Sequence, residues 1–335
     1  MKKRELMILV VGVLLAFNSG AQATVTMDWV AVGNAGNAAD STGYGGVSDV
    51  YQISTYEVTA GQYTEFLNAV ATTDTHGLYN TSMNSSSYGC QITQNGASGS
   101  YTYDFSGRPS GTEADWANRP VNYVSWYDSL RFSNWLHNGQ GAGDTEDGAY
   151  DMSLGSSVVR KAGAQVWLPS EDEWYKAAYY KGGGTNAGYW DYPTSSDSAP
   201  GRDGLETTNP GNNANYYDSG YLIGSPYYRT VVGEFELSDS PYGTFDMGGN
   251  VFEWNEALIY GSGRGFRGGS YYGDLVDLSS SYRYDYGSPD LEGSYLGFRV
   301  ASVPVACPSA DLTNDCFVNF EDLAKLAAQW LTGWQ

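Results

Sequence analysis

Apolar residues recur at helical spacing in three segments of the chain, residues 59–70, 125–137 and 170–181. Each segment opens on a serine or threonine that is followed three residues later by a glutamine, aspartate or glutamate. Such a pair can cap a helix, because each side chain accepts a hydrogen bond from the backbone N–H of the other residue. We therefore predict three helices, the last of which should end near Lys181 because three glycines follow it.

Strand-like patterns are short and scattered. Residues 49–58 alternate as a strand would, and residues 100–105 and 230–237 carry shorter strand-like pieces. Residues 71–119 are rich in Ser, Gly, Asn and Thr without a clear period, which predicts a long surface excursion, and residues 185–245 are again rich in turns. The pattern predicts a fold with few helices and many turns.

The chain begins with the features of a secretory signal peptide. Positions 2–4 are basic, residues 6–17 form an apolar run, and residues 21–23 read Ala-Gln-Ala, a small-x-small cleavage pattern. An uncleaved membrane anchor is the alternative, but the run is about a dozen residues and a span needs roughly 20. We predict a signal peptide over residues 1–23, no membrane span, and a mature protein that is secreted, periplasmic or held at the cell surface.

The chain is strongly acidic. Its formal charge of -21 falls to about -23 without residues 1–23, which carry three positive side chains and one negative one. This charge argues against nucleic acid, anionic membranes or a sulfated glycan as partners, unless a basic patch or bound calcium intervenes. It is consistent with simple solubility and also with binding of divalent cations.

Aromatic residues and glycines are frequent, whereas cysteine and histidine are rare. The 29 tyrosines, 10 tryptophans and 43 glycines predict many turns held together by aromatic packing. Cys307 and Cys316 are close enough in sequence to pair in an oxidising compartment, which would leave Cys90 unpaired. His76 and His137 are far apart, which argues against a zinc or iron site built from histidines.

Residues 246–299 are crowded with glycines and aromatics, and they look too irregular for a long helix or a plain alternating strand. Within them, Asp246 and Glu253 bracket the turn of DMGGNVFEW, so their carboxylates could converge on one hard cation while the carbonyls between them complete an oxygen cage. The alternative is that Glu253 only accepts hydrogen bonds from loop amides. We favour calcium because the ligand types are right.

Six blocks carry a resemblance to a known family: YEVTAGQYTEFLNAV, RPVNYVSWYDSLRFSNWL, LPSEDEWYKAAYY, YGTFDMGGNVFEW, RGGSYY and LGFRVA, in that order. Together they resemble the formylglycine-generating enzyme, or sulfatase-modifying factor, family over about residues 28–302. The resemblance implies an irregular α+β fold related to C-type lectins. We place this domain at residues 24–303 and a small loop–helix module at residues 304–335.

The resemblance also implies what chemistry is missing. Some members of the family oxidise a sulfatase cysteine to formylglycine with a pair of cysteines that bind copper(I). Those two positions are Gly273 and Leu278 in this chain, and neither side chain can ligate copper, which argues against copper as a cofactor. Other relatives hold a non-haem iron with histidines from an added helical domain, which this chain lacks.

Calcium, in contrast, carries over from the family. The resemblance assigns side-chain ligands to Asp246 and Glu253 and main-chain ligands to Gly249 and Val251. A second ion site of the family begins at an Ala-Asn-aromatic step, and the candidates for it are Asn215 and Asp218.

The resemblance further indicates a binding surface. Arg267, Gly268, Gly269, Ser270, Phe298 and Arg299 match the frame around the family's cleft. Without the cysteines this surface looks like a binding site, although core or rim packing is the alternative for each residue. The candidates are Tyr271, Tyr272, Asp274, Tyr282, Arg283, Tyr284 and Asp285.

The C-terminal tail resembles one repeat of a dockerin. Oxygen ligands fall at loop positions 1, 3, 5, 7, 9 and 12, and an amphipathic helix follows. The tail has one repeat where dockerins usually have two, and Cys316 stands where glycine is usual. We favour a calcium-binding attachment or assembly module over a helix that simply docks on the main domain. Its ligands would be Asp311, Thr313, Asp315, the carbonyl of Phe317, Asn319 and Asp322.

Two functions remain open at this point. The first is a secreted, non-catalytic member of the family that binds a protein or glycan in a calcium-stabilised domain, with the tail for attachment. The second is a protein-modifying oxidoreductase that has replaced the copper pair. The missing cysteines favour the first.

Overall fold

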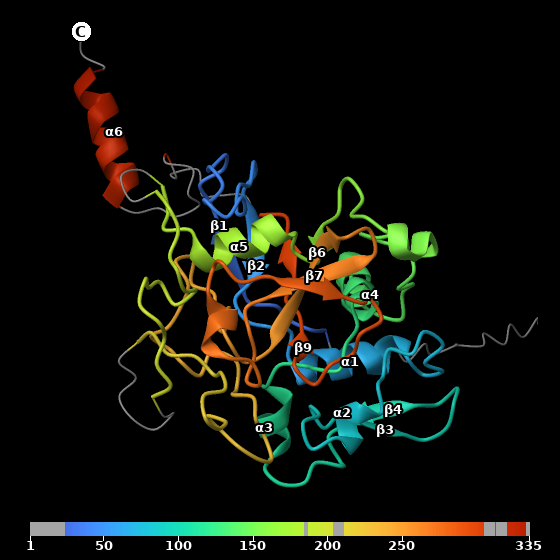
Figure 1. The fold of residues 1–335 in the computed structure, drawn as a ribbon. Helices are drawn as coiled ribbons and strands as arrows, with labels where there is room; N and C mark the ends of the chain where they lie inside the picture. Colours follow the sequence, from blue (N-terminus) through green and yellow to red (C-terminus); the bar gives the residue numbers. More distant parts are fainter. Residues whose placement is uncertain (1–23, 184–186, 204–210, 305–311, 313–319, 333–335) are drawn as a thin grey trace, which may run out of the picture.

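Two four-stranded sheets form the centre of the fold (Figure 1). The computed structural model describes residues 24–183, 187–203, 211–304, 312 and 320–332. The first sheet is antiparallel throughout and joins the two ends of the main domain, since Ala301 pairs with Ile53 on one side and with Trp167 on the other. Its strand order is β1 (Trp29–Val32), β2 (Tyr51–Ser54), β10 (Ala301–Ser302) and β5 (Val166–Trp167).

The second sheet lies within residues 246–299, the segment that looked too irregular for a long helix or a plain alternating strand, and its longest strand indeed does not alternate. Strand β6 runs for eight residues. Its first four side chains are all buried, so the sequence shows no alternation between polar and apolar positions. Strand β9 pairs with β6 in parallel and β7 pairs with β6 antiparallel. The order is β8 (Tyr284–Gly287), β7 (Gly263–Arg267), β6 (Phe252–Ile259) and β9 (Leu296–Gly297).

The three predicted helices are present, and each begins with a complete capping box. Helix α1 covers Ala60–Val70, α4 covers Trp126–His137 and α5 covers Glu171–Tyr179. Helix α5 stops before the predicted end because Tyr180 is already extended, with ψ at 123°.

The predicted surface excursion of residues 71–119 contributes to the core instead. Its Ile92, Tyr103 and Trp116 are all at most 3% exposed. The prediction missed α3 because that helix is too short to show a period, although Thr112 and Asp115 form a capping box. Residues 71–119 form the elements α2 (Ser82–Ser85), β3 (Thr93–Asn95), β4 (Thr102–Asp104) and α3 (Glu113–Ala117).

Two strand predictions need correction. Residues 49–58 form a strand only at β2, and residues 230–237 form no strand at all. In the second segment Glu234 N–H bonds to the carbonyl of Val231, and Ser238 N–H bonds to that of Phe235. These bonds close tight turns, in which Phe235 packs inward and Leu237 is exposed, so the segment does not pair along a strand.

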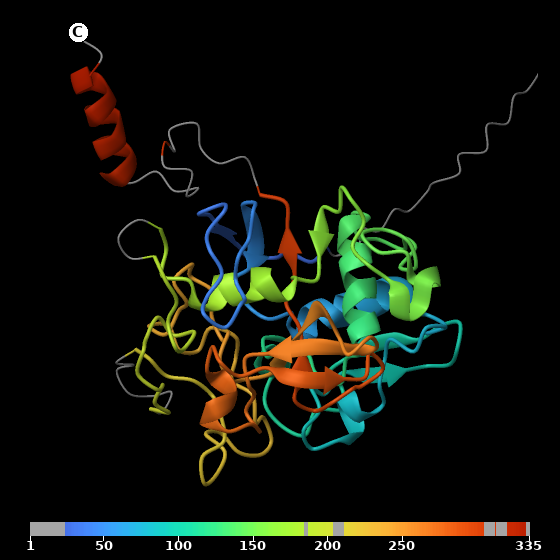
Figure 2. The ribbon, with the colours of Figure 1, turned by 45° about the horizontal axis from the view of Figure 1, so that its top comes forward.

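Aromatic rings connect the helices to the sheets. Phe132 of α4 lies 5.3 Å from Phe66 of α1 and 5.3 Å from Phe298, measured between ring centroids. Figure 2 shows α1 and α4 on the same side of the body, with α5 beside β2. These ring contacts join α1 and α4 to the segment that leads into β10, as the aromatic content of the sequence predicted.

The remaining elements are short, except for the helix of the tail. Within the described residues, 3₁₀ helices cover Met152–Ser157 (η1) and Leu275–Leu278 (η3). Helix α6 (Phe320–Thr332) stands apart from the body in both views (Figures 1 and 2). Among the residues that the structure describes, no helix has both the length and the apolar character needed to cross a bilayer.

Candidate functional site

The turn of residues 246–250 is held between two other loops. Asp246, Gly249 and Asn250 all have positive φ angles, of 57°, 86° and 60°. Asn250 N–H donates to the carbonyl of Asn215 at 2.8 Å, and its own carbonyl accepts from Tyr271 N–H at 2.9 Å. The turn therefore fixes the loops that begin at residues 215 and 271 relative to each other.

Glu253, at the end of this segment, is fully engaged by protein groups. Arg299 Nε donates to Oε2 at 2.6 Å and Arg299 Nη2 donates to Oε1 at 2.8 Å. Trp174 Nε1 donates to Oε2 at 2.7 Å. Glu253 and Arg299 are both 0% exposed. A calcium ion at this turn would have to share Glu253 with Arg299. The alternative predicted for Glu253 was hydrogen bonds from loop amides, but its partners are the side chains of Arg299 and Trp174.

Negative charge accumulates beside this ion pair. Asp246 Oδ2 accepts from Gly233 N–H at 2.6 Å, and burial raises the pKa of Asp246 to about 6. Glu57 is 1% exposed, and burial followed by the charges of Asp246 and Glu253 raises its pKa well above the usual range. Three carboxylates thus share one guanidinium, an arrangement that a cation would stabilise.

The second predicted ion site offers one unsatisfied oxygen. Asn215 is 1% exposed, and its Nδ2 donates to the carbonyl of Tyr228 at 3.0 Å and to Asn250 Oδ1 at 3.3 Å. Its Oδ1 has no hydrogen-bond partner within the described residues. An orphaned buried oxygen is a suitable metal ligand. Asp218, by contrast, is exposed and accepts from Ser219 Oγ.

No set of three or more His, Cys, Asp or Glu side chains is close enough to hold a metal ion in the part of the chain that the structure describes. Any ion at these turns would therefore depend on carbonyl and amide oxygens. Gly249 and Val251, the predicted carbonyl ligands, lie in the buried part of the turn.

A group of tyrosines surrounds the start of the 271 loop, and we name it the tyrosine cluster: Tyr88, Tyr217, Tyr221, Tyr228, Tyr271 and Tyr272. Tyr221 lies at its centre, with ring centroids 4.9 Å from Tyr228, 5.3 Å from Tyr217 and 6.4 Å from Tyr272. Tyr271 is fully buried and Tyr272 is 58% exposed. Sequence reasoning missed Tyr88, Tyr217, Tyr221 and Tyr228, because they lie in turn-rich segments without a period.

Two loops bring acidic groups to the edge of this cluster. Tyr217 N–H donates to the carbonyl of Gly273 at 2.8 Å, which joins the 214–221 loop to the 270–274 loop. Asp218 and Asp274 follow these two residues directly and are exposed. The predicted residues Tyr272 and Asp274 thus share one surface with Asp218, and Tyr271 lies buried beneath it.

The other predicted binding residues are held by separate contacts. Arg283 forms an ion pair with Glu171 at 2.7 Å, and the ring of Tyr284 stacks on Phe266 at 4.3 Å. Tyr282 packs against the core, and its carbonyl accepts from Arg267 at 2.6 Å. The side chain of Asp285 lies outside the described residues.

The positions of the family's cysteines are built for packing. Leu278 is 0% exposed and packs with Ala214 and Tyr216. A Cβ atom at Gly273 would lie 2.3 Å from Asp277 Oδ2, so a larger residue would displace that carboxylate. Cys90, the one cysteine that the structure describes, is free and buried, and burial raises the pKa of its thiol.

In the tail, the structure describes one of the predicted calcium ligands. Asp322 is 3% exposed, and its Oδ1 accepts from Leu312 N–H at 2.7 Å. Residues 1–23, Cys307 and Cys316 lie outside the described residues, as do the remaining loop ligands Asp311, Thr313, Asp315, Phe317 and Asn319.

Comparison with known proteins supports the reading of the main domain. The model of the sulfatase-modifying factor enzyme 1-like domain matches residues 27–303. No curated protein matches the chain. The solved structure of CarF shares 21% identity, covers 84% of this chain and 100% of its own, and superposes with a TM-score of 0.50, which shows a common fold.

Two further structures are similar at lower scores. Variable protein 1 of Treponema denticola has 21% identity, covers 83% of this chain and 95% of its own, and has a TM-score of 0.46. PvdO from Pseudomonas aeruginosa has 17% identity, coverages of 83% and 92%, and a TM-score of 0.45. The family match spans most of the chain, so the predicted α+β fold is confirmed at that level. The chain belongs to the sulfatase-modifying factor enzyme 1-like family.

Proposed function

We propose that this protein is an exported, non-catalytic member of its family that binds a glycan or protein ligand on the tyrosine cluster. The observation that carries the proposal is the pair of family cysteine positions, where Leu278 is a core residue and Gly273 faces the Asp277 carboxylate. Beside them lies an aromatic surface rather than a thiolate pair.

The tyrosine cluster has the features of a contact surface. Tyr272 is 58% exposed, while Tyr221 behind it is half-buried and rests on the buried ring of Tyr271. A rigid aromatic ring offers a large contact area at low cost in conformational entropy, and Asp218 and Asp274 supply acceptors at its edge. The aromatic rings and the carboxylate acceptors together suit a ligand that has an apolar ring face and hydroxyl or amide donors.

A printed glycan array tests the surface with two tyrosine variants. We expect a defined set of glycans to bind the wild type, and Tyr272→Ala to reduce that binding by about tenfold or more. Tyr260→Ala is the matched control, because Tyr260 is 81% exposed on the β6–β7 hairpin and belongs to no part of the cluster. Equal loss in both variants would contradict the assignment of the cluster.

The competing oxidoreductase function has its own assay. The protein would be incubated with a cysteine-containing sulfatase peptide, copper and oxygen, and the peptide mass measured. We expect no formylglycine, because no copper-binding thiolate occupies position 273 or 278. Formation of formylglycine would overturn the non-catalytic assignment.

We also propose that calcium stabilises the main domain. The excess of carboxylates around Glu253 and the orphaned Oδ1 of Asn215 support this proposal. Thermal melting in calcium and in chelator is the test, and we expect a lower midpoint in chelator. Asn215→Ala should reduce that shift, whereas Asp290→Asn, an exposed carboxylate elsewhere, should retain it. An unchanged midpoint would contradict the proposal.

Export and the tail complete the proposed function. We expect expression of the full chain in a bacterium to yield a periplasmic protein that begins at Thr24, as intact mass would show. The tail would bind calcium through its predicted loop and present the apolar face of α6 to an assembly partner. Leu323, Leu326 and Trp330 on that face are 57%, 46% and 79% exposed.

A further inference from the structure

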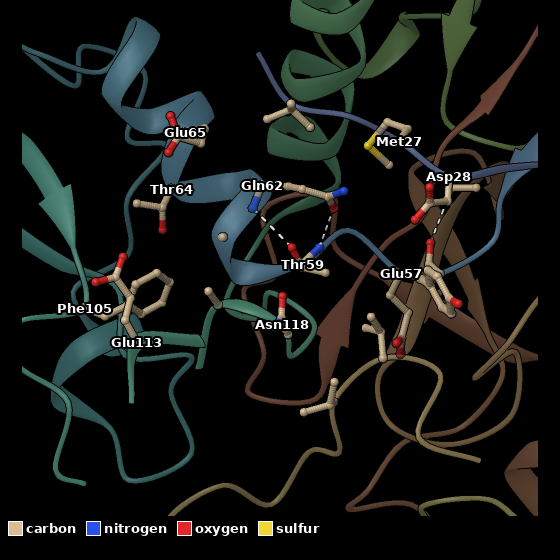
Figure 3. Close-up of a pocket in the computed structure, with 17 residues that line it drawn as sticks. Met27, Asp28, Glu57, Thr59, Gln62, Thr64, Glu65, Phe105, Glu113 and Asn118 are labelled. Atoms are coloured by element: carbon tan, nitrogen blue, oxygen red, sulfur yellow. Dashed lines mark hydrogen bonds between the residues drawn. The ribbon is translucent and has the colours of Figure 1, made fainter. Parts of the chain in front are cut away.

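A pocket lies away from the tyrosine cluster, where the N-terminal segment passes helices α1 and α3 (Figure 3). Its volume is about 590 Å³. Its lining includes Val25, Met27 and Asp28 of the N-terminal segment, residues of the first turn of α1, and Val231 and Val232. The proposed function uses one residue of its lining, Glu57, as a member of the group of carboxylates beside Glu253.

Among the described residues, four carboxylates line the pocket and no lysine, arginine or histidine does. The carboxylates belong to Asp28, Glu57, Glu65 and Glu113. Figure 3 shows Glu65 and Glu113 at one end and Asp28 and Glu57 at the other. The lining also includes apolar side chains, namely those of Val25, Met27, Phe105, Val231 and Val232. Figure 3 shows Phe105 beside Glu113 and Met27 beside Asp28. The pocket is therefore lined by carboxylates at both ends, and apolar side chains share its lining.

Glu57 distinguishes this pocket from an ordinary acidic surface. It is 1% exposed, whereas Asp28, Glu65 and Glu113 are exposed to solvent. Its Oε2 accepts from Asn250 Nδ2 at 3.2 Å, but its Oε1 has no hydrogen-bond partner within the described residues. A buried carboxylate oxygen without a donor is costly, so a ligand that brings a charged donor would be bound favourably.

The spacing of the carboxylates favours an organic cation over a metal ion. No three of the described acidic side chains converge closely enough to hold one ion. Gln62 is not free to help, because its Oε1 accepts from Thr59 N–H at 2.9 Å and its Nε2 donates to the carbonyl of Thr26 at 3.0 Å. Carboxylates at the two ends of the pocket match two positive charges that are separated by a hydrocarbon chain.

Hydrogen bonds fix the backbone of the pocket walls. Val25 on its wall is held at both backbone groups by Gln140, which accepts from Val25 N–H at 2.7 Å and donates to its carbonyl at 2.8 Å. The capping box of Thr59 and Gln62 fixes the first turn of α1. A ligand would therefore meet a site that needs little ordering.

We propose that this pocket binds alkylammonium groups, either those of a linear polyamine or the side-chain ammonium of a lysine. One ammonium lies at the Glu57 end, and the hydrocarbon chain lies against the apolar walls. In a polyamine, a second ammonium reaches the end formed by Glu65 and Glu113.

Isothermal titration of the full chain in about 0.15 M salt, which screens diffuse surface attraction, tests the proposal. The probes are spermidine and the peptide acetyl-Lys-Ala-Lys-amide, and acetyl-Gln-Ala-Gln-amide is the uncharged control. We expect saturable binding of at least one of the two charged probes. Binding of spermidine alone identifies a free polyamine, and binding of the peptide alone identifies a lysine side chain.

Carboxylate variants locate the binding. Glu57→Gln is close to isosteric and should weaken binding about tenfold, while Glu113→Gln at an exposed position should weaken it by about threefold. Asp290→Asn removes an exposed charge outside the pocket and should leave binding unchanged. If Glu57→Gln fails to fold, Glu65→Gln and Glu113→Gln still decide the question. Absence of binding, or equal binding by the pocket variants and Asp290→Asn, would overturn the proposal.

Discussion

At the residue scale, a few charged side chains are buried with little compensation. Asp128, in the first turn of α4, is 3% exposed and accepts from Ser125 N–H at 2.9 Å and from Ser125 Oγ at 2.6 Å. Lys176 in α5 is 0% exposed, and its Nζ donates to the carbonyl of Asn34 at 3.0 Å. Burial disfavours the charged form of both groups, so each makes stability depend on pH.

Asp128 should destabilise the fold as the solution becomes less acidic. Burial raises its pKa to about 7, whereas the unfolded chain titrates near its ordinary value of about 3.9. Between these values the folded state binds more protons, so stability falls as the pH rises and is constant above about 7. Urea unfolding should show wild type losing about 2–4 kcal/mol relative to Asp128→Asn between pH 4.5 and pH 8. A constant difference would show that Asp128 is not protonated in the fold.

Lys176 should behave in the opposite sense. Burial lowers its pKa to about 8, so its cost is present below that pH and disappears above about 10.4, where the unfolded chain also loses the proton. Lys176→Met should therefore stabilise the protein by about 1–2 kcal/mol at pH 7, after the loss of the bond to Asn34. Lys161→Met is the control, because Lys161 is partly exposed and pairs with the exposed Asp147, and it should change stability by less than about 0.5–1 kcal/mol. Destabilisation by Lys176→Met would show that the ammonium is well solvated.

At the scale of elements, short turns carry as much of the architecture as the helices do. Gly249 has φ at 86°, and a Cβ atom there would lie 2.4 Å from the carbonyl oxygen of Asn215. Only glycine lets the 246–250 turn and the 214–216 loop cross so closely. Both loops lead directly into the tyrosine cluster and the start of β6.

Gly249→Ala should cost about 3 kcal/mol or more, because it adds a backbone clash to the strain of a positive φ. Gly261→Ala is a matched control, since Gly261 has φ at 82° and no atom within 4 Å of the added Cβ. That variant should lose only about 1–2 kcal/mol. Urea unfolding in chelator measures both without a contribution from metal. Similar losses would show that the loops can separate at little cost.

At the scale of the whole molecule, Arg299 connects the two sheets. It pairs with Glu253 of β6, and its Nη1 donates to the carbonyl of Ser54 at the end of β2 at 2.9 Å. Its Nη2 also donates to the carbonyl of Phe245 at 2.8 Å, beside the 246–250 turn. One guanidinium thus holds both sheets and the turn, which fits the role of scaffold rather than ligand contact.

Arg299→Met should destabilise the protein by about 3–5 kcal/mol, because Glu253 would remain buried and unpaired. The double variant Arg299→Met with Glu253→Gln removes the stranded charge, and it should be more stable than the single Arg299→Met variant. Denaturant unfolding of the single and double variants, in chelator, gives this comparison. Additive losses would contradict the direct coupling of the two side chains.

The sequence by itself determined the features that depend on neighbours a few residues apart. The capping boxes at Thr59, Ser125 and Ser170 were predicted and are present, because a cap needs only a side chain and an amide three residues away. The order of the family's blocks likewise predicted the fold of the main domain, which the match over residues 27–303 confirms.

Only the tertiary structure decided the contacts between distant segments. β6 is buried at its start on both faces, so no period marks it as a strand. The partners of Glu253 lie 46 and 79 positions away, at Arg299 and Trp174. The tyrosine cluster and the acidic pocket each gather residues from several loops. Such sites depend on chain crossings, whose stability comes from packing and burial rather than from local propensity.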